Sequence, residues 1–166
     1  LKVAVIERSY IGSGSTSRCI GGIRQQFSTP TSIRLMKENI SLFSQMEEEF
    51  GHTVEFHDGG YLFLAHNEEM LEIFKRNVAT QQKEDVNVKL VTPEEIKEIV
   101  PDISTDGLLG GTYCPDDAQA YPFFVLKGYH RGILDNGGDF LLRNPVTGMV
   151  KETHFVLTLA DGSQVE

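Results

Sequence analysis

The sequence contains few basic residues, only two cysteines and no tryptophan. There are 15 Lys and Arg against 24 Asp and Glu, so the formal net charge at pH 7 is -9. Nucleic acids and anionic membrane surfaces both require local positive charge, so this composition argues against either as a partner. No apolar segment approaches the ~20 residues of a membrane span, and the first residues lack the basic-plus-apolar pattern of a signal peptide.

Cys19 and Cys114 form no spacing motif, which favours a reducing compartment, and we expect a cytoplasmic protein. The five histidines are scattered, so the sequence predicts no metal site. A chain of 166 residues with this apolar content is typical of a globular protein with a core of respectable size.

The opening residues carry the strongest functional signal. Val3 to Ile6 is an unbroken apolar run that ends on Glu7. Such a run predicts a strand buried on both faces of a parallel sheet. An acid at the carboxyl end of that strand would lie where a dinucleotide places its ribose hydroxyls. The alternative is a strand-end acid that faces water.

A loop rich in glycine and hydroxyl side chains follows, from Gly12 to Arg18. Its backbone N–H groups and hydroxyls can bind phosphate. Arg18 and Arg24 suit an anion, either phosphate or a substrate carboxylate. The alternative is a solvated loop whose arginines pair with surface acids. Residues 23–27 predict a short helical turn.

The position of Glu7 in the chain is unusual for a nucleotide-binding βαβ unit. In such units a glycine fingerprint precedes the acid by roughly 20 residues. Here six residues precede Glu7, and none is glycine. We therefore expect the chain to begin inside such a unit, at its second strand.

The rest of the chain mixes helices and strands. Thr29, Pro30 and Gly51 predict the start and end of one helix, and Thr92 and Glu95 form a capping box that starts another. Further predicted elements are a hairpin over 54–65, a helix from Asn67, strands over 86–91 and 107–113, a polar turn-like link over 114–120, a helix from Pro122, a strand over 140–142 and a β-meander over 146–166.

Several of these segments, taken together and in order, resemble one enzyme family. They are Ile6 to Phe27, Asp58 to Leu64, Val91 to Glu95 and Pro115 to Phe123. The chain resembles the D-amino-acid-oxidase-like FAD-dependent oxidoreductases over essentially its whole length. Within that family it is similar to sarcosine oxidase beta subunits, with glycine oxidase, amine-demethylating dehydrogenases and proline dehydrogenase subunits as related members.

The resemblance implies FAD as the cofactor and assigns residues to it. Glu7 would bind the adenosine ribose, with Arg8 near the adenine. The residues implied along the pyrophosphate and flavin are Ser13, Ser15, Thr16 and Arg18, and those implied at the border of the flavin ring are Gly21, Gly22 and Ile23. No catalytic residue is assigned.

The activity that the resemblance implies is oxidation of a C–N bond in an amino acid or N-methylated amine, such as sarcosine, glycine, dimethylglycine or proline. The flavin accepts a hydride equivalent, and water hydrolyses the resulting imine. The family's glycine fingerprint and C-terminal half have no counterpart in this sequence. We therefore expect an internal fragment of a longer enzyme that, by itself, binds FAD weakly or not at all and is inactive.

The predicted fold is α/β plus α+β: a partial FAD-binding, Rossmann-like domain with part of an inserted substrate domain. The predicted boundaries are residues 1–51 for part of the FAD-binding domain, 52–113 for part of the substrate domain, and 114–166 for the continuation of the FAD-binding domain with a β-meander. Two alternatives remain: a non-enzymatic α+β ligand-binding or interaction module, and a component completed by a second subunit. Uncovered apolar faces would also favour self-association.

Overall fold

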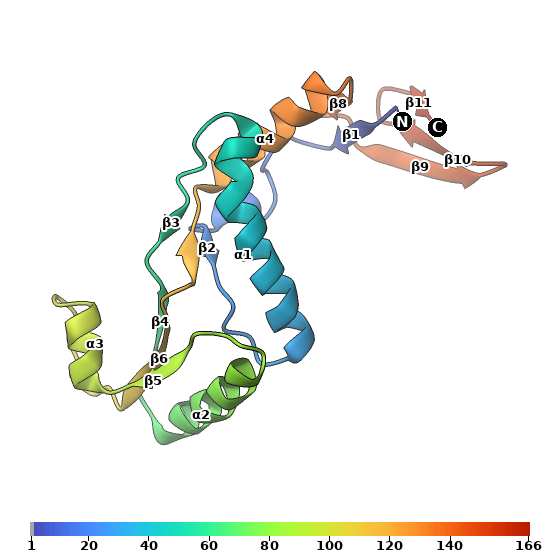
Figure 1. The fold of residues 1–166 in the computed structure, drawn as a ribbon. Coiled ribbons are helices and arrows are strands. Elements are labelled where there is room, and N and C mark those ends of the chain that lie inside the picture. The colour runs from blue at the N-terminus through green and yellow to red at the C-terminus, as the bar shows by residue number, and fades with distance from the viewer. Residues whose placement is uncertain (1) are drawn as a thin grey trace. The chain divides into compact units, whose positions relative to one another are not determined.

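The structure is a computed structural model that describes residues 2–166 (Figure 1). The chain divides into two compact units. The first contains residues 1–20 and 122–166, and the second contains residues 21–121.

The first unit contains a parallel strand pair. Strand β1 (Ala4–Glu7) pairs with β8 (Asp139–Leu142), with Val5 opposite Phe140. Helix α4 (Pro122–Asp135) precedes β8, and a short 3-10 helix, η1 (Thr16–Arg18), lies in the loop after β1. The predicted parallel strand is thus confirmed, as is the fold class of mixed α/β and α+β structure.

The prediction that this first strand is buried on both faces is wrong for the residues described. Ala4 is exposed, and the rest of β1 is only half-buried. The reason is its position in the sheet, because among residues 2–166 β8 is its only hydrogen-bonded neighbour.

The end of the chain forms the predicted meander. Strands β9 (Val146–Lys151), β10 (Phe155–Leu159) and β11 (Gln164–Val165) pair antiparallel in the order β11-β10-β9. The turn between β10 and β11 places Gly162 at φ 85°, a conformation that glycine adopts without strain.

The second unit begins with β2 (Gly22–Ile23) and the long helix α1 (Pro30–Phe50). Thr29 accepts a hydrogen bond from the Ser32 N–H and caps the helix, and Gly51 ends it at φ 66°. Both predicted ends are confirmed. Between residues 2 and 166, no helix is both long and apolar enough to cross a bilayer.

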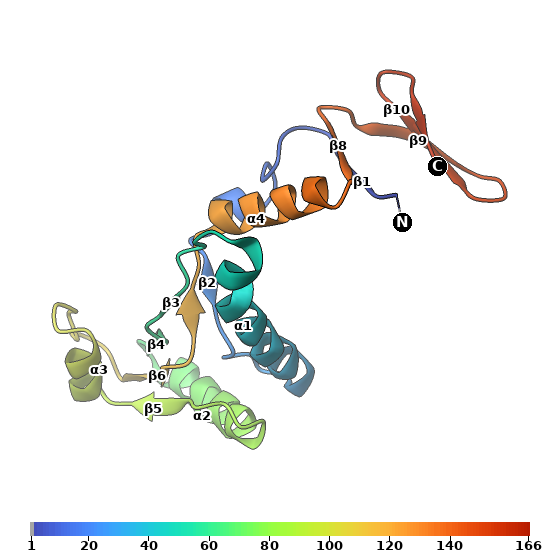
Figure 2. The same ribbon diagram turned by 45° about the horizontal axis from the view of Figure 1, so that its top comes forward.

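A three-stranded antiparallel sheet forms the centre of the second unit. Its order is β4 (Tyr61–Ala65), β6 (Gly110–Cys114) and β5 (Lys89–Val91). Helices α2 (Glu68–Lys83) and α3 (Pro93–Ile99) pack beside it (Figure 2).

Two clusters of buried side chains form the core of this unit. One contains Val91, Ile96 and Leu108, and Leu62 packs against it. The other, at α1 and α2, contains Ile33, Val78, Val86, Val88 and Cys114.

Alternation along β4 turns Phe63 to the face opposite that of Leu62, and Phe63 contacts Phe74 on α2. The two helices therefore cover opposite faces of the sheet.

The second unit contains another small sheet, and three local predictions made for its residues are wrong. Its order is β2, β7 (Ala118–Gln119) and β3 (His57–Asp58). The predicted hairpin over 54–65 is wrong, because β3 pairs with β7 whereas β4 pairs with β6. The helical turn over 23–27 is also wrong, because Ile23 is extended in β2. The link over 114–120 is not a simple polar turn, because it contains β7 and a fully buried Asp117.

The unit boundaries also differ from the domain boundaries expected from the sequence. The units meet at residues 20/21 and 121/122, whereas the expected boundaries are 51/52 and 113/114. Helix α1 belongs to the second unit because Ile33 packs with Val78 and Cys114.

Candidate functional site

An open pocket of about 460 Å³ lies at the carboxyl end of β1 in the first unit. It joins the end of this strand, the glycine-serine loop and the segment after β8. The residues that line it are Ile6, Glu7, Arg8, Ser13, Gly14, Arg18, Pro145 and Val146.

Glu7 is held in this pocket by its own loop. Its Oε1 accepts a hydrogen bond from the Ser9 N–H at 2.6 Å and another from the Ser13 hydroxyl at 3.1 Å. Among residues 2–166, no hydrogen bond reaches Oε2. A carboxylate with one oxygen fixed and the other open can accept hydrogen bonds from the hydroxyls of a sugar.

The loop after β1 has a defined conformation that places its polar groups beside Glu7. The Ser13 N–H donates to the Tyr10 carbonyl at 2.9 Å. Gly12 has φ 83°, and a Cβ there would lie 2.9 Å from Leu126 on α4. The positive φ therefore favours glycine at this position, and the end of the Leu126 side chain would have to shift to admit a Cβ.

Arg8 and Arg18 supply positive charge to the same pocket. Both side chains are exposed, and Arg18 Nη1 donates to the Gly14 carbonyl at 3.3 Å. This bond keeps the guanidinium group beside the loop and leaves its other N–H groups available. The arrangement can bind an anion.

The structure places the remaining expected residues of the loop next to the pocket but not in its wall. Ser15 precedes η1, and its carbonyl accepts from the Arg18 N–H at 3.0 Å. The Thr16 carbonyl accepts from the Cys19 thiol at 3.1 Å. Of the six residues expected here, Glu7, Arg8, Ser13 and Arg18 line the pocket, and Ser15 and Thr16 do not.

Sequence reasoning missed Pro145 and Val146, which line the pocket from the segment after β8. The signal was present, because residues 140–142 were expected to form a strand. A strand parallel to β1 places its carboxyl end, and the residues that follow, at the same edge as Glu7.

Gly21, Gly22 and Ile23 belong to the second unit. Gly22 and Ile23 form β2 and pair with β7, and Gly21 accepts a hydrogen bond from the Ala120 N–H at 3.0 Å. A Cβ on Gly22 would lie 3.0 Å from the Tyr61 ring, so glycine allows the aromatic side chain to approach the backbone.

Arg24 directly follows β2 and lies among three aromatic rings. Its guanidinium carbon is 5.0 Å from the ring centroid of Phe27, 5.9 Å from that of Tyr61 and 5.2 Å from that of Phe63. Its Nε is buried and has no hydrogen-bond partner within residues 2–166. Arg24 is thus not in a solvated loop, and one of its N–H donors remains available for an anion.

Buried Asp117 fixes the backbone next to Arg24. Its Oδ1 accepts from the Gln25 N–H at 2.7 Å, and its Oδ2 accepts from Gln26 Nε2 at 3.0 Å. Burial raises the pKa of the Asp117 carboxyl, and the hydrogen bonds from Gln26 and Gln25 oppose this shift. Asp117 was missed at the sequence level, where it stands in a stretch that reads as an exposed polar link.

The comparisons with known proteins agree on one family. The family model described as "DAO: FAD dependent oxidoreductase" matches residues 1–166. The chain is 29% identical to sarcosine oxidase subunit beta of Rhodobacter capsulatus over 154 residues. It is 31% identical to FAD-dependent oxidoreductase domain-containing protein 1 of Bos taurus over 173 residues. L-proline dehydrogenase from P. horikoshii matches in structure with a TM-score of 0.88 and 36% identity.

These matches cover most of this chain and less than half of each relative. They include 90% of this chain and 37% of the Rhodobacter protein, and 99% of this chain and 35% of the bovine protein. The match to the proline dehydrogenase covers 99% of this chain and 44% of that chain.

Proposed function

The chain belongs to the FAD-dependent oxidoreductase family, and from this membership we propose that it contributes the adenosine-binding part of an enzyme that oxidises the C–N bond of an amino acid or N-methylated amine. The observation that carries the proposal is Glu7, a carboxylate at the carboxyl end of a parallel strand, with Oε2 facing no hydrogen-bond partner among residues 2–166.

The pocket at Glu7 fits the adenosine half of FAD. Oε2 of this carboxylate would accept a hydrogen bond from a ribose hydroxyl, and the Ser13 hydroxyl holds the carboxylate in place. Arg8 would lie near the adenine, and Arg18 would supply charge for the diphosphate, together with the hydroxyls of Ser15 and Thr16. In the second unit, Gly21, Gly22 and Ile23 are the residues that the resemblance assigns to the flavin ring, which would supply the redox chemistry when FAD is bound.

Arg24 is the proposed anchor for the substrate carboxylate. Sarcosine and L-proline, which two of the relatives' names contain, each carry a carboxylate beside the amine. The half-buried guanidinium group with an unpartnered Nε offers a charge-assisted hydrogen bond to that carboxylate. The three surrounding rings keep water away from the bond and strengthen it.

The proposed domain roles are those that the family resemblance implies. Residues 1–51 and 114–166 contribute to FAD binding, and residues 52–113 contribute to the substrate domain. A second subunit is a proposed partner, because a relative is itself a named subunit. Two free thiols, Cys19 and Cys114, fit a reducing compartment such as the cytoplasm.

The test uses the protein expressed from its complete reading frame. After purification and desalting, the visible absorbance of bound flavin is measured, and L-proline, sarcosine, glycine and dimethylglycine are then added without oxygen. We expect retained flavin, and loss of its oxidised absorbance with at least one of these amines. Absence of retained flavin would contradict the cofactor assignment and favour a non-enzymatic module, whereas flavin that none of the four amines reduces would contradict the substrate class.

A further inference from the structure

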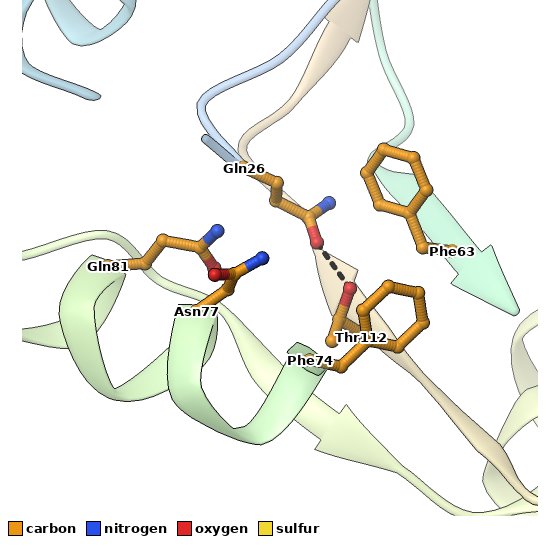
Figure 3. A pocket seen from close by; sticks show the side chains of 6 residues that line it. All are labelled: Gln26, Phe63, Phe74, Asn77, Gln81 and Thr112. Atoms are coloured by element: carbon orange, nitrogen blue, oxygen red, sulfur yellow. Dashed lines mark hydrogen bonds between the residues drawn. The ribbon is translucent and has the colours of Figure 1, made fainter. Parts of the chain in front are cut away.

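A second, smaller pocket lies between the central sheet and helix α2 of the second unit (Figure 3). Its volume is about 180 Å³. Phe63 and Thr112 come from paired positions on β4 and β6. Three further lining residues, Phe74, Asn77 and Gln81, lie on one face of α2, because they are spaced by three and four residues. The full lining is Gln26, Phe63, Phe74, Asn77, Gln81 and Thr112.

The Gln81 amide has one unused and buried hydrogen-bonding atom. The residue is 2% exposed, and its Nε2 donates to the Phe27 carbonyl at 2.9 Å. This bond fixes which end of the amide carries the oxygen. Oε1 is buried and has no partner among residues 2–166. Leaving such an acceptor unpaired is unfavourable, so the pocket favours an occupant that donates a hydrogen bond.

Two of the neighbouring polar side chains, Thr112 and Gln26, are already paired. Thr112 donates its hydroxyl hydrogen to Gln26 Oε1 at 2.6 Å, the bond drawn in Figure 3. Gln26 Nε2 donates to the Tyr61 carbonyl at 2.8 Å and to Asp117 Oδ2 at 3.0 Å. These two side chains are therefore held in place before any ligand arrives.

Two aromatic rings supply the apolar part of the pocket. The ring centroids of Phe63 and Phe74 are 6.2 Å apart, at an interplanar angle of 53°. The volume is comparable to the ~150 Å³ cavity that accepts benzene in an engineered protein. A single six-membered ring or an apolar body of similar size therefore fits.

The surroundings of the pocket disfavour a charged ligand of either sign. None of the six lining residues is charged. The Arg24 guanidinium carbon already lies 5.2 Å from the Phe63 ring centroid, so a second cation against that ring would be repelled. An anion would lie beside the unpaired oxygen of Gln81, which disfavours it as well.

We propose that this pocket binds a small neutral molecule with one ring-sized apolar body and one O–H or N–H donor, which binds Gln81 Oε1. The apolar body lies against Phe63 and Phe74. Asn77, half-buried on the same helix, offers a further donor and acceptor at the rim. None of the residues lining this pocket lines the Glu7 pocket.

Phenol and toluene are matched probes for this proposal, because they have nearly the same size and only phenol carries a donor. Binding is measured on the protein expressed from its complete reading frame, by chemical-shift titration of backbone amides. We expect phenol to bind roughly tenfold more tightly than toluene, with shifts at Gln81 and Thr112. Equal affinities, or no binding of phenol, would overturn the proposal.

Two variants locate the site. Gln81→Leu removes the acceptor and should abolish the preference for phenol. Phe74→Trp fills the pocket and should weaken both probes, which keeps the test valid if Gln81→Leu does not fold. Arg76→Lys, at an exposed position on the same helix, is the matched control and should bind both probes as the unsubstituted protein does. A crystal soaked in phenol that shows only a water at Gln81 Oε1 would also overturn the proposal.

Discussion

Asp117 Oδ1 accepts a hydrogen bond from the backbone N–H of Gln25, 92 residues earlier in the chain, at 2.7 Å. The bond joins the segment after β2 to the residue that precedes β7, and Arg24 is the residue immediately before the donor. The proposed carboxylate anchor therefore depends on a fully buried acid for its position.

Asp117→Asn should lower the free energy of unfolding by about 1–3 kcal/mol. The reason is that Oδ2 would become an amide nitrogen facing Gln26 Nε2, and two donors would then oppose each other. Urea denaturation followed by circular dichroism measures the loss. Asp116→Asn, at the exposed neighbouring acid, is the control and should change stability little.

The difference in the free energy of unfolding between the unsubstituted protein and Asp117→Asn should depend on pH. Burial raises the pKa of Asp117 above its ordinary 3.8. The stability linked to its protonation is therefore fully present below 3.8 and is lost as the pH rises through the raised pKa. The stability advantage of the unsubstituted protein should shrink as the pH rises from 3.8. An advantage that stays constant or grows would show that the pKa of Asp117 is not raised.

The two thiols should react at very different rates in the folded protein. Cys19 is exposed and Cys114 is buried, and burial, followed by the charge of Asp117, raises the pKa of Cys114 to about 12. Because the thiolate is the reactive form, a thiol reagent at neutral pH should modify Cys19 and leave Cys114 unmodified until the protein is denatured. Mass spectrometry identifies the site, and Cys19→Ser should remove the fast reaction. Rapid modification of Cys114 in that variant would contradict the described burial.

Gly111→Ala should destabilise the central sheet. A Cβ at this position of β6 would overlap the Phe63 carbonyl oxygen on β4, and neither backbone can move without breaking the pairing. We expect a loss of about 1–3 kcal/mol in thermal or urea denaturation. Gly148→Ala is the matched control in a strand, because its Cβ would lie 3.7 Å from Thr158, an ordinary contact. Equal stability of the two variants would contradict the described approach of β4 and β6.

Arg24→Lys should raise the KM for the amine substrate about tenfold or more and change kcat less. Lysine keeps the positive charge but lacks the Nε donor and the planar group that lies among the three rings. Arg131→Lys, at an exposed helix position, is the control. An unchanged KM in Arg24→Lys would assign the carboxylate to another residue.

Local signals in the sequence predicted much of the secondary structure. Thr29 and Gly51 mark the ends of α1, and the Thr92–Glu95 capping box starts α3, because each acts through residues only a few positions away. Strand pairing was predicted less well. His57 and Asp58 pair with β7 rather than with the adjacent strand, a choice that depends on residues sixty positions later.

In the candidate site too, residues close in sequence were predicted together, whereas contributions from distant segments were missed. Glu7, Ser13 and Arg18 lie close in sequence and were predicted together, and they line one pocket. Val146 completes that pocket from the other end of the chain, and the pattern around Glu7 contains no information about it. Asp117 was missed because its burial comes from packing between distant segments, whereas its neighbours in sequence are typical of a turn.

The role of Glu7 in cofactor binding is tested most directly by comparing the dissociation constant of FAD for the unsubstituted protein and for Glu7→Gln. Both constants are measured by titration on protein expressed from its complete reading frame. Glutamine keeps an oxygen for Ser9 and Ser13 and replaces the free Oε2 with an amide nitrogen. We predict that Glu7→Gln weakens FAD binding tenfold or more, because a charge-assisted bond to the ribose is lost, while the exposed control Glu152→Gln binds FAD unchanged. Equal dissociation constants for all three proteins would contradict the assignment of Glu7 to the cofactor.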